Sequence, residues 1–433
     1  MPAAKRERRS IALTTTVTAI MRFHSVLSIA VSALSHLAWA AEQSILTSGS
    51  QSNIVLAAHL GPYPVSIYEH EIKTLRPDPL APTAQLRRLM VTVYRPFLDN
   101  LTCPLEYQSH IPYAPPVVAN TVLKLLPLNL SSPNASSILA PVQLVNCSRP
   151  VPSSSPSGPL LLFSHGYGGT RHFYASTLQA AASSGYTVVA IDHTYEAAAV
   201  VFPDGSVAYT SAANDAYDES GLDGINFLLA NRVADTVSVL DAIERGDIPG
   251  LGRYSNASSG TDSTSISSPT PLRAIMYGHS FGGSTAANVA ASDARVLAAV
   301  NIDGLFYGPV ANGTVRKPLL LMASTPQEAA TDWPTFYPSH VRGWKTWVRP
   351  NNTAHYGYTD LPLLVDLLGL RGAVVPQDLT GTVDSRRLQE IVWRYTLQFF
   401  AYVLRGTTPD LLDGPNAEFP DVEFVGHAEA GTG

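Results

Sequence analysis

The chain lacks the features that mark several large functional classes. Only 14% of its 433 residues are charged, and the net charge of −6 gives no support for a nucleic-acid or anionic-membrane partner. It contains no Walker loop, no G-x-G-x-x-G dinucleotide motif and no H-E-x-x-H zinc motif. Its twelve histidines show no metal-ligand spacing. We therefore expect no metal and no cofactor, and no nucleic acid among its partners.

Cysteine is equally scarce. The chain has two, Cys103 and Cys147, both before residue 150. In an oxidising compartment the two thiols could pair, and otherwise they would stay free. The residues alone leave both alternatives open.

Long hydrophobic runs are also missing. The apolar run at 26–37 is broken by serines and a histidine and is short for a membrane span. A basic segment precedes it, and Ala38-Trp39-Ala40, an A-x-A-like cleavage site, follows it. We interpret residues 1–40 as a signal peptide, with Met21 as an alternative start and a signal anchor as the competing interpretation. The protein is therefore expected to be secreted.

Asparagine sequons agree with a secreted glycoprotein. Several of them fall in loop-like stretches, where glycans are tolerated. The N-x-[ST] sequons begin at Asn100, Asn129, Asn134, Asn146, Asn256, Asn312 and Asn351.

What the chain does contain is an alternation of apolar strands and helices, after an early strand at 87–96 that is expected to be antiparallel. Such alternation implies a mainly parallel sheet with helices on both faces, an α/β fold. We expect a single catalytic domain over 45–433, with loop elaborations at 100–158 and 254–271. Strands are predicted at 159–163, 186–191, 274–277, 296–302, 318–322 and 344–348, and helices at 173–184, 225–245 and 385–404.

Two of these segments carry finer expectations. In the helix at 225–245, the residues at helical spacing predict a buried face. The apolar island at 121–130 is interpreted as a buried packing segment, with contact to a lipid surface as the alternative. The residues of the helical face are Leu228, Leu229, Val233, Val237, Leu240 and Ile243.

The most informative stretch is Gly278-His279-Ser280-Phe281-Gly282, a G-x-S-x-G match. It follows the strand at 274–277 and precedes small, helix-compatible residues at 284–291, which is the context of a nucleophilic serine. The glycines permit a strained turn that lifts the Ser280 hydroxyl out of the sheet. We interpret Ser280 as a nucleophile, with a glycine-rich turn of another α/β fold as the alternative.

A serine hydroxyl needs a base, which in turn needs an orienting carboxylate. In α/β-hydrolases these follow the serine in the order Ser, Asp/Glu, His. His427 is expected in a solvated polar tail and His340 in a loop between elements, whereas His355 comes just after the last predicted strand. We predict that His355 is the general base.

Two positions compete for the carboxylate. Asp303 ends the strand at 296–302, where the ligand crevice of such sheets lies, although an aspartate before glycine is also a common turn residue. Asp332 and Glu328 follow the next strand, the position that general α/β-hydrolase reasoning favours. The pattern alone leaves the choice open.

An oxyanion hole needs two N–H donors. One is expected from Phe281, directly after the nucleophile. The other is expected from Tyr167 in the loop Ser164-His165-Gly166-Tyr167-Gly168-Gly169, whose glycines let N–H groups face a ligand. A plain glycine-rich turn is the alternative interpretation of this loop.

With these residues in place, the chain resembles the platelet-activating-factor acetylhydrolase family, in its secreted, lipoprotein-type and fungal branch. The resemblance covers roughly residues 60–405, the Ser/Pro-rich loops excepted. It is carried by Phe163-Ser-His-Gly-Tyr-Gly168, Gly278-His-Ser-Phe-Gly-Gly283, Asn301-Ile-Asp-Gly304, Asp192-His-Thr-Tyr-Glu196 with Phe202-Pro-Asp-Gly205, and His355 followed by Asp360.

The resemblance implies the α/β-hydrolase fold and a catalytic acid on the strand directly after the nucleophile. It therefore favours Asp303, which lies 303 − 280 = 23 residues after Ser280, over Asp332. It also implies calcium-independent hydrolysis of a short or oxidised sn-2 acyl chain of a phospholipid, a 1-alkyl-2-acetylglycerophosphocholine esterase activity. The alternatives are a lipase- or cutinase-like esterase with the same machinery and a non-catalytic binding protein on this scaffold.

Overall fold

The structure is a computed structural model that describes most of the chain after the expected signal peptide. The competing acids Asp332 and Glu328 and nearly all of the loop at 254–271 lie outside the described residues. None of the described helices is both long and apolar enough to cross a membrane. The described residues are 53–56, 61–99, 101–126, 136–150, 158–251, 271–324, 333–371 and 375–428.

A nine-stranded sheet organises the described part of the chain, in the order β14-β13-β12-β11-β10-β6-β7-β3-β2. Its six central strands are parallel, and β3, β2 and β14 add antiparallel strands at the two edges. This arrangement confirms the predicted α/β class and the antiparallel early strand. The strands are β2 (Val65–Pro77), β3 (Leu86–Pro96), β6 (Leu160–Ser164), β7 (Thr187–Asp192), β10 (Ala274–His279), β11 (Val296–Ile302), β12 (Leu319–Met322), β13 (Lys345–Pro350) and β14 (Val422–Ala428).

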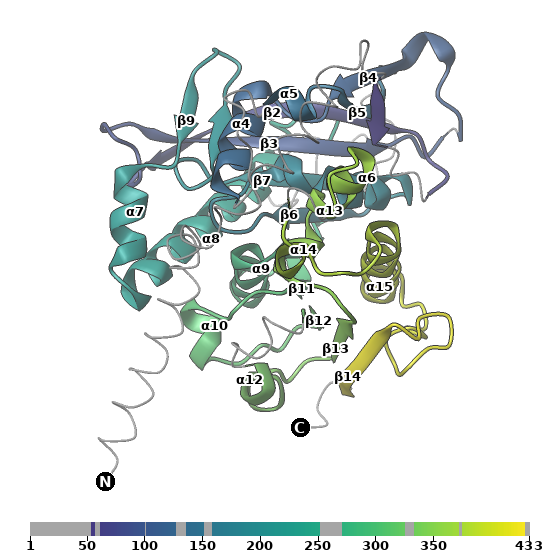
Figure 1. The fold of residues 1–433 in the computed structure, drawn as a ribbon. Helices are drawn as coiled ribbons and strands as arrows, with labels where there is room; N and C mark the ends of the chain where they lie inside the picture. Colours follow the sequence, from purple (N-terminus) through teal and green to yellow (C-terminus); the bar gives the residue numbers. More distant parts are fainter. Residues whose placement is uncertain are drawn as a thin grey trace, which may run out of the picture.

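Most of the central strands are nearly continuous apolar runs because both faces of the sheet are covered, whereas β13 also carries Lys345 and Arg349. Along β10, Ile275 and Tyr277 point into one hydrophobic core, and Ala274 and Met276 point into the other. In Figure 1, α8 (Leu222–Arg245) and α9 (Phe281–Ser292) lie to the left of the sheet, and α6 (Ala175–Ser183) and α15 (Ser385–Arg405) lie to the right. The sheet thus separates two cores. Because its six central strands are parallel, their carboxyl ends lie along the same edge of the sheet.

Shorter elements fill the connections between the strands. A two-stranded hairpin of β8 and β9 follows β7. Outside residues 108–147, these shorter elements are η2 (Leu105–Tyr107), η3 (Arg171–Tyr174), β8 (Ala199–Val201), β9 (Val207–Tyr209), α7 (Ala212–Glu219), α10 (Gly308–Asn312), α12 (Trp333–His340), η4 (His355–Tyr358), α13 (Leu361–Leu367) and α14 (Gln377–Thr380).

The buried face of α8 differs from the predicted one. Val233 and Val237 are only half-buried, whereas Arg232 and Asp235 are completely buried on the neighbouring turns. Their burial is possible because each charge has a partner, Glu196 for Arg232 and Arg87 for Asp235. A hydrophobic pattern cannot reveal a buried face that is built partly from paired charges.

Residues 100–158 were expected to be loops, and that expectation was wrong for much of the segment. It holds β4 (Gln108–Pro112), β5 (Val142–Cys147), α4 (Pro116–Leu125) and α5 (Ser136–Leu139), and the two strands join β1 (Ile54–Leu56) in a second, three-stranded sheet. In the described part of the apolar island, the side chains of Val122, Leu123 and Leu126 are buried and that of Leu125 is exposed, so most of this part is a packing segment. Proline and serine between the elements hid these short strands.

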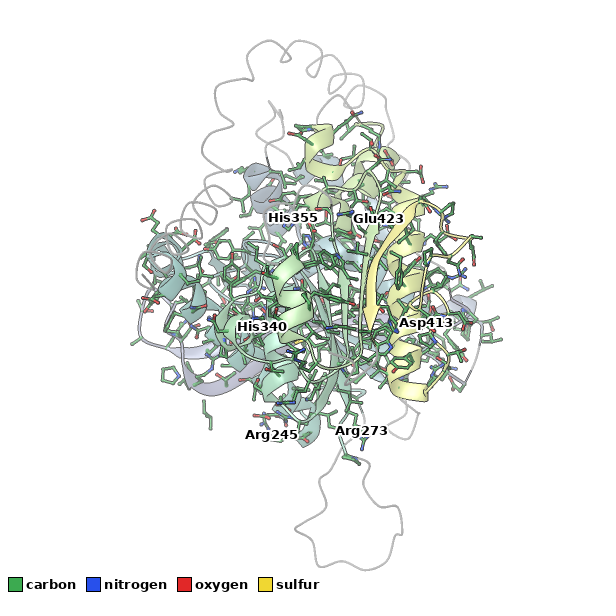
Figure 2. The ribbon with its side chains drawn as sticks, turned by 90° about the horizontal axis from the view of Figure 1, so that it is seen from below. Arg245, Arg273, His340, His355, Asp413 and Glu423 are labelled. Atoms are coloured by element: carbon green, nitrogen blue, oxygen red, sulfur yellow. A yellow bond between two sulfur atoms is a disulfide. The ribbon has the colours of Figure 1, made fainter. Side chains whose placement is uncertain are left out.

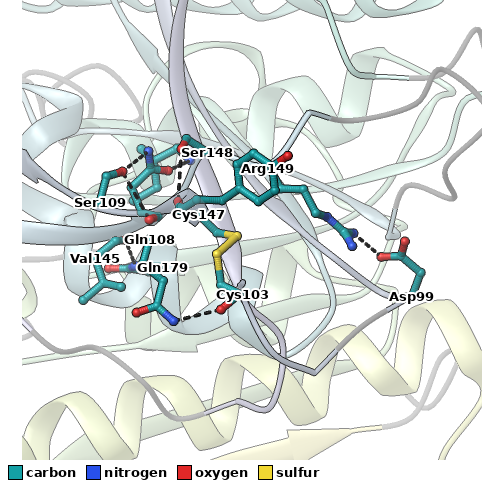
Figure 3. The surroundings of a disulfide bond; sticks show 12 residues. Asp99, Cys103, Gln108, Ser109, Val145, Cys147, Ser148, Arg149 and Gln179 are labelled. Carbon is teal, nitrogen blue, oxygen red and sulfur yellow. Dashed lines mark hydrogen bonds and ion pairs between the residues drawn. A yellow bond between two sulfur atoms is a disulfide. The ribbon is translucent and has the colours of Figure 1, made fainter. Parts of the chain in front are cut away.

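A disulfide fastens this second sheet. Cys103, just before η2, bonds Cys147 at the end of β5, with their Cα atoms 5.9 Å apart (Figure 3). Beside it, Arg149 pairs with Asp99. The bond links the segment that follows β3 to the C-terminal end of β5 in the small sheet. Neither cysteine of the chain is free.

We predict that the double substitution Cys103→Ser/Cys147→Ser lowers the free energy of unfolding by about 2–4 kcal/mol. The physical reason is that the bond spans a sequence separation of 44 residues, whose closure limits the unfolded chain. Urea denaturation of the oxidised protein and of the variant measures the difference. An unchanged midpoint and slope, or thiols that titrate in the native wild type, would contradict the assignment.

Candidate active site

Ser280 occupies a strained turn at the centre of the sheet. It lies between β10 and α9 with φ 56° and ψ −124°, a backbone conformation that residues with a Cβ rarely adopt. A Cβ on Gly278 would lie 2.4 Å from the carbonyl carbon of Gly282, and one on Gly282 would lie 2.0 Å from the Ser164 oxygen. The strand, the turn and the helix can therefore approach each other only with glycine at both positions.

His355 and Asp303 meet Ser280 from two other strands. The Nε2 atom of His355 lies 3.0 Å from Ser280 Oγ, and its Nδ1–H donates to Asp303 Oδ2 at 2.7 Å. Asp303 follows β11 and His355 follows β13, so all three residues come from the carboxyl ends of parallel strands. Figure 2 shows His355 at the opposite end of the sheet from Arg273, which precedes β10.

The Asp303 carboxylate is held by further donors. It is 1% exposed, and it accepts from the Ser324 backbone N–H at 2.5 Å and from the Ser324 hydroxyl at 2.8 Å. Together with His355, these donors fix the position of the carboxylate. Ser324 lies two residues after the end of β12. Its role was not predicted, because a serine near the end of a strand is not a distinctive signal in the sequence.

The turn that carries Asp303 is stabilised by hydrogen bonds between its own residues. The Asn301 side chain donates to the Gly304 carbonyl and accepts from the Gly304 N–H, both at 2.9 Å. A Cβ on Gly304 would lie 2.1 Å from the Ser280 carbonyl oxygen. The motif Asn301-Ile-Asp-Gly304 therefore shapes a turn that brings Asp303 close to the serine turn.

The two other histidines lie away from this group. His340 ends α12, where its Nδ1 bonds the Gly313 carbonyl at 2.6 Å, so it is helical rather than in the expected loop. His427 was expected in a solvated tail, which was wrong. It lies in β14, antiparallel to β13, and bonds the Thr346 hydroxyl at 2.8 Å.

His279 links three segments around the serine turn. Its Nε2–H donates to the carbonyl of His355 at 2.9 Å, so its Nδ1 accepts from the Tyr174 hydroxyl, also at 2.9 Å. The Tyr174 oxygen in turn accepts from the Gly166 N–H at 3.2 Å. Burial lowers the pKa of His279 well below its usual range, so the ring stays neutral. This histidine therefore supports the turn rather than reacting.

His279, Asp303 and His355 offer possible metal-ligand atoms within 4.8 Å of one another. In the tautomers described above, the unprotonated ring nitrogens already accept from the Ser280 and Tyr174 hydroxyls, and the Asp303 carboxylate accepts from His355. A cation at this place would have to break these hydrogen bonds.

Asp360 anchors the segment that carries His355. Its N–H donates to the Phe173 carbonyl at 2.8 Å, and its carboxylate accepts from Tyr113 and from the hydroxyl and N–H of Ser176. Burial raises the pKa of Asp360 to about 6. The histidine segment is thus tied to α6 and to the segment between β4 and α4.

The two expected oxyanion donors flank Ser280. The rings of Tyr167 and Phe281 meet edge to face at 6.0 Å, and a Cβ on Gly166 would lie 3.3 Å from Ser280 Cβ. Within the described ranges, neither the Tyr167 N–H nor the Phe281 N–H donates to a protein acceptor. Both donors are therefore available to a ligand.

An aromatic wall borders these donors. Phe281 packs edge to face against Tyr307 at 5.8 Å, and Tyr217 stacks on Phe227 at 4.0 Å. This wall is apolar with several partly exposed rings, which suits contact with an acyl chain or an aryl group. Its residues are Leu80, Ile225, Leu228, Leu229, Phe281 and Tyr307, with Tyr167, Tyr195, Tyr217, Phe227 and Leu305 partly exposed.

Comparisons with known proteins agree with this architecture. A probable 1-alkyl-2-acetylglycerophosphocholine esterase of Arthroderma benhamiae is 29% identical over 281 residues, which cover 62% of this chain and 66% of that protein. A ferulic acid esterase structure from Streptomyces cinnamoneus is 30% identical, with a TM-score of 0.68 over 87% of this chain and all of that one.

The family assignment follows from a match to a family model. Residues 135–406 match the family described as platelet-activating factor acetylhydrolase, isoform II, which is more than half of the chain. This match covers the segments that contain Ser280, Asp303 and His355. The chain therefore belongs to the platelet-activating factor acetylhydrolase, isoform II family, a family of carboxylic ester hydrolases.

Proposed function

We propose that the protein is a serine esterase in which Ser280, His355 and Asp303 form the catalytic triad. The observation that carries the proposal is the continuous line of hydrogen bonds from Asp303 through His355 to Ser280. Because the Asp303 carboxylate accepts the Nδ1–H, the lone pair of Nε2 faces the serine hydroxyl. That is the tautomer a general base requires.

The reaction proceeds in two halves. Ser280 Oγ attacks the ester carbonyl carbon while His355 Nε2 takes its proton, and the N–H groups of Phe281 and Tyr167 stabilise the oxyanion. The intermediate collapses by breaking the bond to the leaving alcohol, which receives the proton from His355. Water then attacks the acyl-enzyme with His355 again as base, and the acid and free Ser280 are released.

For the substrate we propose the short sn-2 acyl group of a phospholipid. Family membership and the name of the Arthroderma relative support this choice. A second candidate is an ester of an aromatic acid, favoured by the aromatic wall beside the oxyanion donors and by the ferulic acid esterase relative. A lipase- or cutinase-like substrate would use the same triad.

We predict that purified protein hydrolyses p-nitrophenyl esters with a preference for acetate over palmitate, and hydrolyses a phospholipid with an sn-2 acetyl group. EDTA should leave the rates unchanged, because the triad transfers protons without a metal. Ser280→Ala should reduce kcat by about 10⁴-fold or more. Circular dichroism should confirm that the variant stays folded.

The outcomes separate the candidates. Preference for long acyl chains would keep the triad and move the function to lipase- or cutinase-like hydrolysis, and preference for methyl ferulate would move it to aromatic esters. More than a few per cent of wild-type turnover in the Ser280→Ala variant would refute the nucleophile. No turnover of any ester, with no labelling by a serine-reactive phosphonate, would revive a non-catalytic binding protein.

A second prediction separates the two candidate acids. Asp303→Asn should lower kcat by about 10⁴-fold, because the amide holds the wrong tautomer of His355. Asp332→Asn is the matched control and should stay within a few-fold of wild type. Steady-state kinetics on p-nitrophenyl acetate measures both, and equal losses or the reverse order would refute Asp303 as the acid.

We also propose that the protein is secreted and glycosylated, from the expected signal peptide and sequons. Among the described sequons, Asn312 and Asn351 are exposed. Asn146 is 8% exposed, and its side chain accepts from the Ile67 N–H at 2.8 Å and donates to Ser109 at 3.2 Å. A glycan attached to Nδ2 would need room that this buried amide, which donates to Ser109, does not have.

From a eukaryotic secretory host, the protein should therefore reach the medium without residues 1–40, with glycans on Asn312 and Asn351 and an unmodified Asn146. Peptide mass spectrometry before and after glycosidase treatment, with N-terminal sequencing, measures all of these. Retention in the cell with residues 1–40 attached would contradict secretion. A glycan on Asn146 of folded, active protein would contradict the site assignment.

A further inference from the structure

Arg232 is a completely buried charge that the proposed reaction does not use. It lies in the middle of α8, is 0% exposed, and has its guanidinium beneath the loop that holds Tyr167. Glu196 neutralises it and accepts from Arg232 Nε at 2.8 Å and 2.9 Å with its two oxygens. A buried pair of this kind is often no more stabilising than apolar residues of the same size. Its presence therefore points to a role other than stability.

The rest of the guanidinium binds the backbone of the oxyanion loop. Arg232 Nη1 donates to the His165 carbonyl at 2.5 Å and to Ser164 Oγ at 3.1 Å. Nη2 donates to the Gly166 carbonyl at 3.3 Å. One side chain thus holds two successive peptide units just before Tyr167.

The Gly166 carbonyl is held from other directions as well. It accepts from the Gly169 N–H at 3.0 Å and from His165 Nδ1 at 2.6 Å. Burial, followed by the nearby Arg232, lowers the pKa of His165 well below its usual range, so Nδ1 donates as a neutral ring. The oxygen of this peptide unit is therefore fixed by three donors.

Fixing this oxygen also fixes the direction of the Tyr167 N–H. In a planar trans peptide, the C=O of one residue and the N–H of the next point to opposite sides. The Tyr167 N–H therefore points away from Arg232. Donation to the carbonyl also polarises the peptide unit, which strengthens its N–H as a donor.

We propose that Arg232 is a positioning residue that orients the Gly166–Tyr167 peptide, so that the Tyr167 N–H meets the oxyanion of the reacting ester. The proposal rests on the proposed esterase function and deepens it. Glu196 holds the guanidinium in place, which gives the segment Asp192-His-Thr-Tyr-Glu196 a part in the same device. Preorganised donors of this kind act on the transition state, since their orientation needs no rearrangement during the reaction.

A second buried arginine offers a matched control. Arg87 is 1% exposed and donates to Asp235, Asp78 and the Thr194 carbonyl. Like Arg232, it is buried and paired with carboxylates, here Asp78 and Asp235, but it has no hydrogen bond to the carbonyls of residues 165 and 166. Loss of stability alone should therefore affect Arg87 and Arg232 variants alike.

The test compares Arg232→Met/Glu196→Met, Arg232→Lys and Arg87→Lys. The double variant removes both charges together and should stay folded, because apolar residues replace the ion pair. Both Arg232 variants should lower kcat for p-nitrophenyl acetate by about 10- to 100-fold, with KM within about threefold. The inhibition constant of a trifluoromethyl ketone, whose adduct carries an oxyanion, should rise by the same factor as kcat falls. Arg87→Lys should leave both values near wild type.

A further readout does not depend on turnover. Amide hydrogen exchange in peptides covering 164–170 should quicken in the Arg232 variants and stay unchanged in Arg87→Lys. Exchange as slow as in wild type would overturn the proposal, even if the wild type hydrolyses no ester and the proposed function fails. In an active enzyme, unchanged kcat, a loss confined to KM, or equal losses in Arg87→Lys would also overturn it.

Discussion

The constraint on which the site depends is the strained backbone of Ser280 at the end of the central strand β10. A residue with φ 56° and ψ −124° is held there only because the surroundings leave no alternative. The Ser280 N–H donates to the Ile302 carbonyl at 2.7 Å, which ties the turn to β11. Strain at this point is thus balanced by the packing of two strands and a helix, and it keeps the hydroxyl clear of the sheet.

Around that turn, separate loops are joined by neutral, buried hydrogen bonds. His279 connects the His355 segment to Tyr174, and Tyr174 connects to the loop of Gly166. The histidine that approaches the serine and the loop expected to hold the oxyanion are therefore not independent. A displacement of either segment is transmitted to the other through the side chains of His279 and Tyr174. This coupling helps the separate loops of the site to keep one geometry.

Much of the fold could be predicted from the sequence, because parallel strands buried on both faces leave continuous apolar runs. The serine turn was predictable because the strand and helix beside it leave no space for a Cβ at Gly278 or Gly282, so the glycines mark it in the sequence. By contrast, the edge strand with His427 and the small sheet of β1, β4 and β5 alternate weakly, and tertiary pairing decides their conformation. Ser324 and Arg232 were missed because each acts through one specific partner, and no pattern of spacing encodes such a contact.

Several of the few charged residues in this chain are buried. Charged side chains make up 14% of the chain, yet Arg87, Arg95, Arg171 and Arg232 are each at most 1% exposed. Arg171 pairs with Asp192 and Glu69, and so anchors the start of the segment that ends at Glu196. Buried pairs add little net stability, but each has only one satisfactory arrangement. Here Arg171 and Arg232 hold segment 192–196 and the loop before Tyr167 in register, while the apolar cores supply the stability of the sheet.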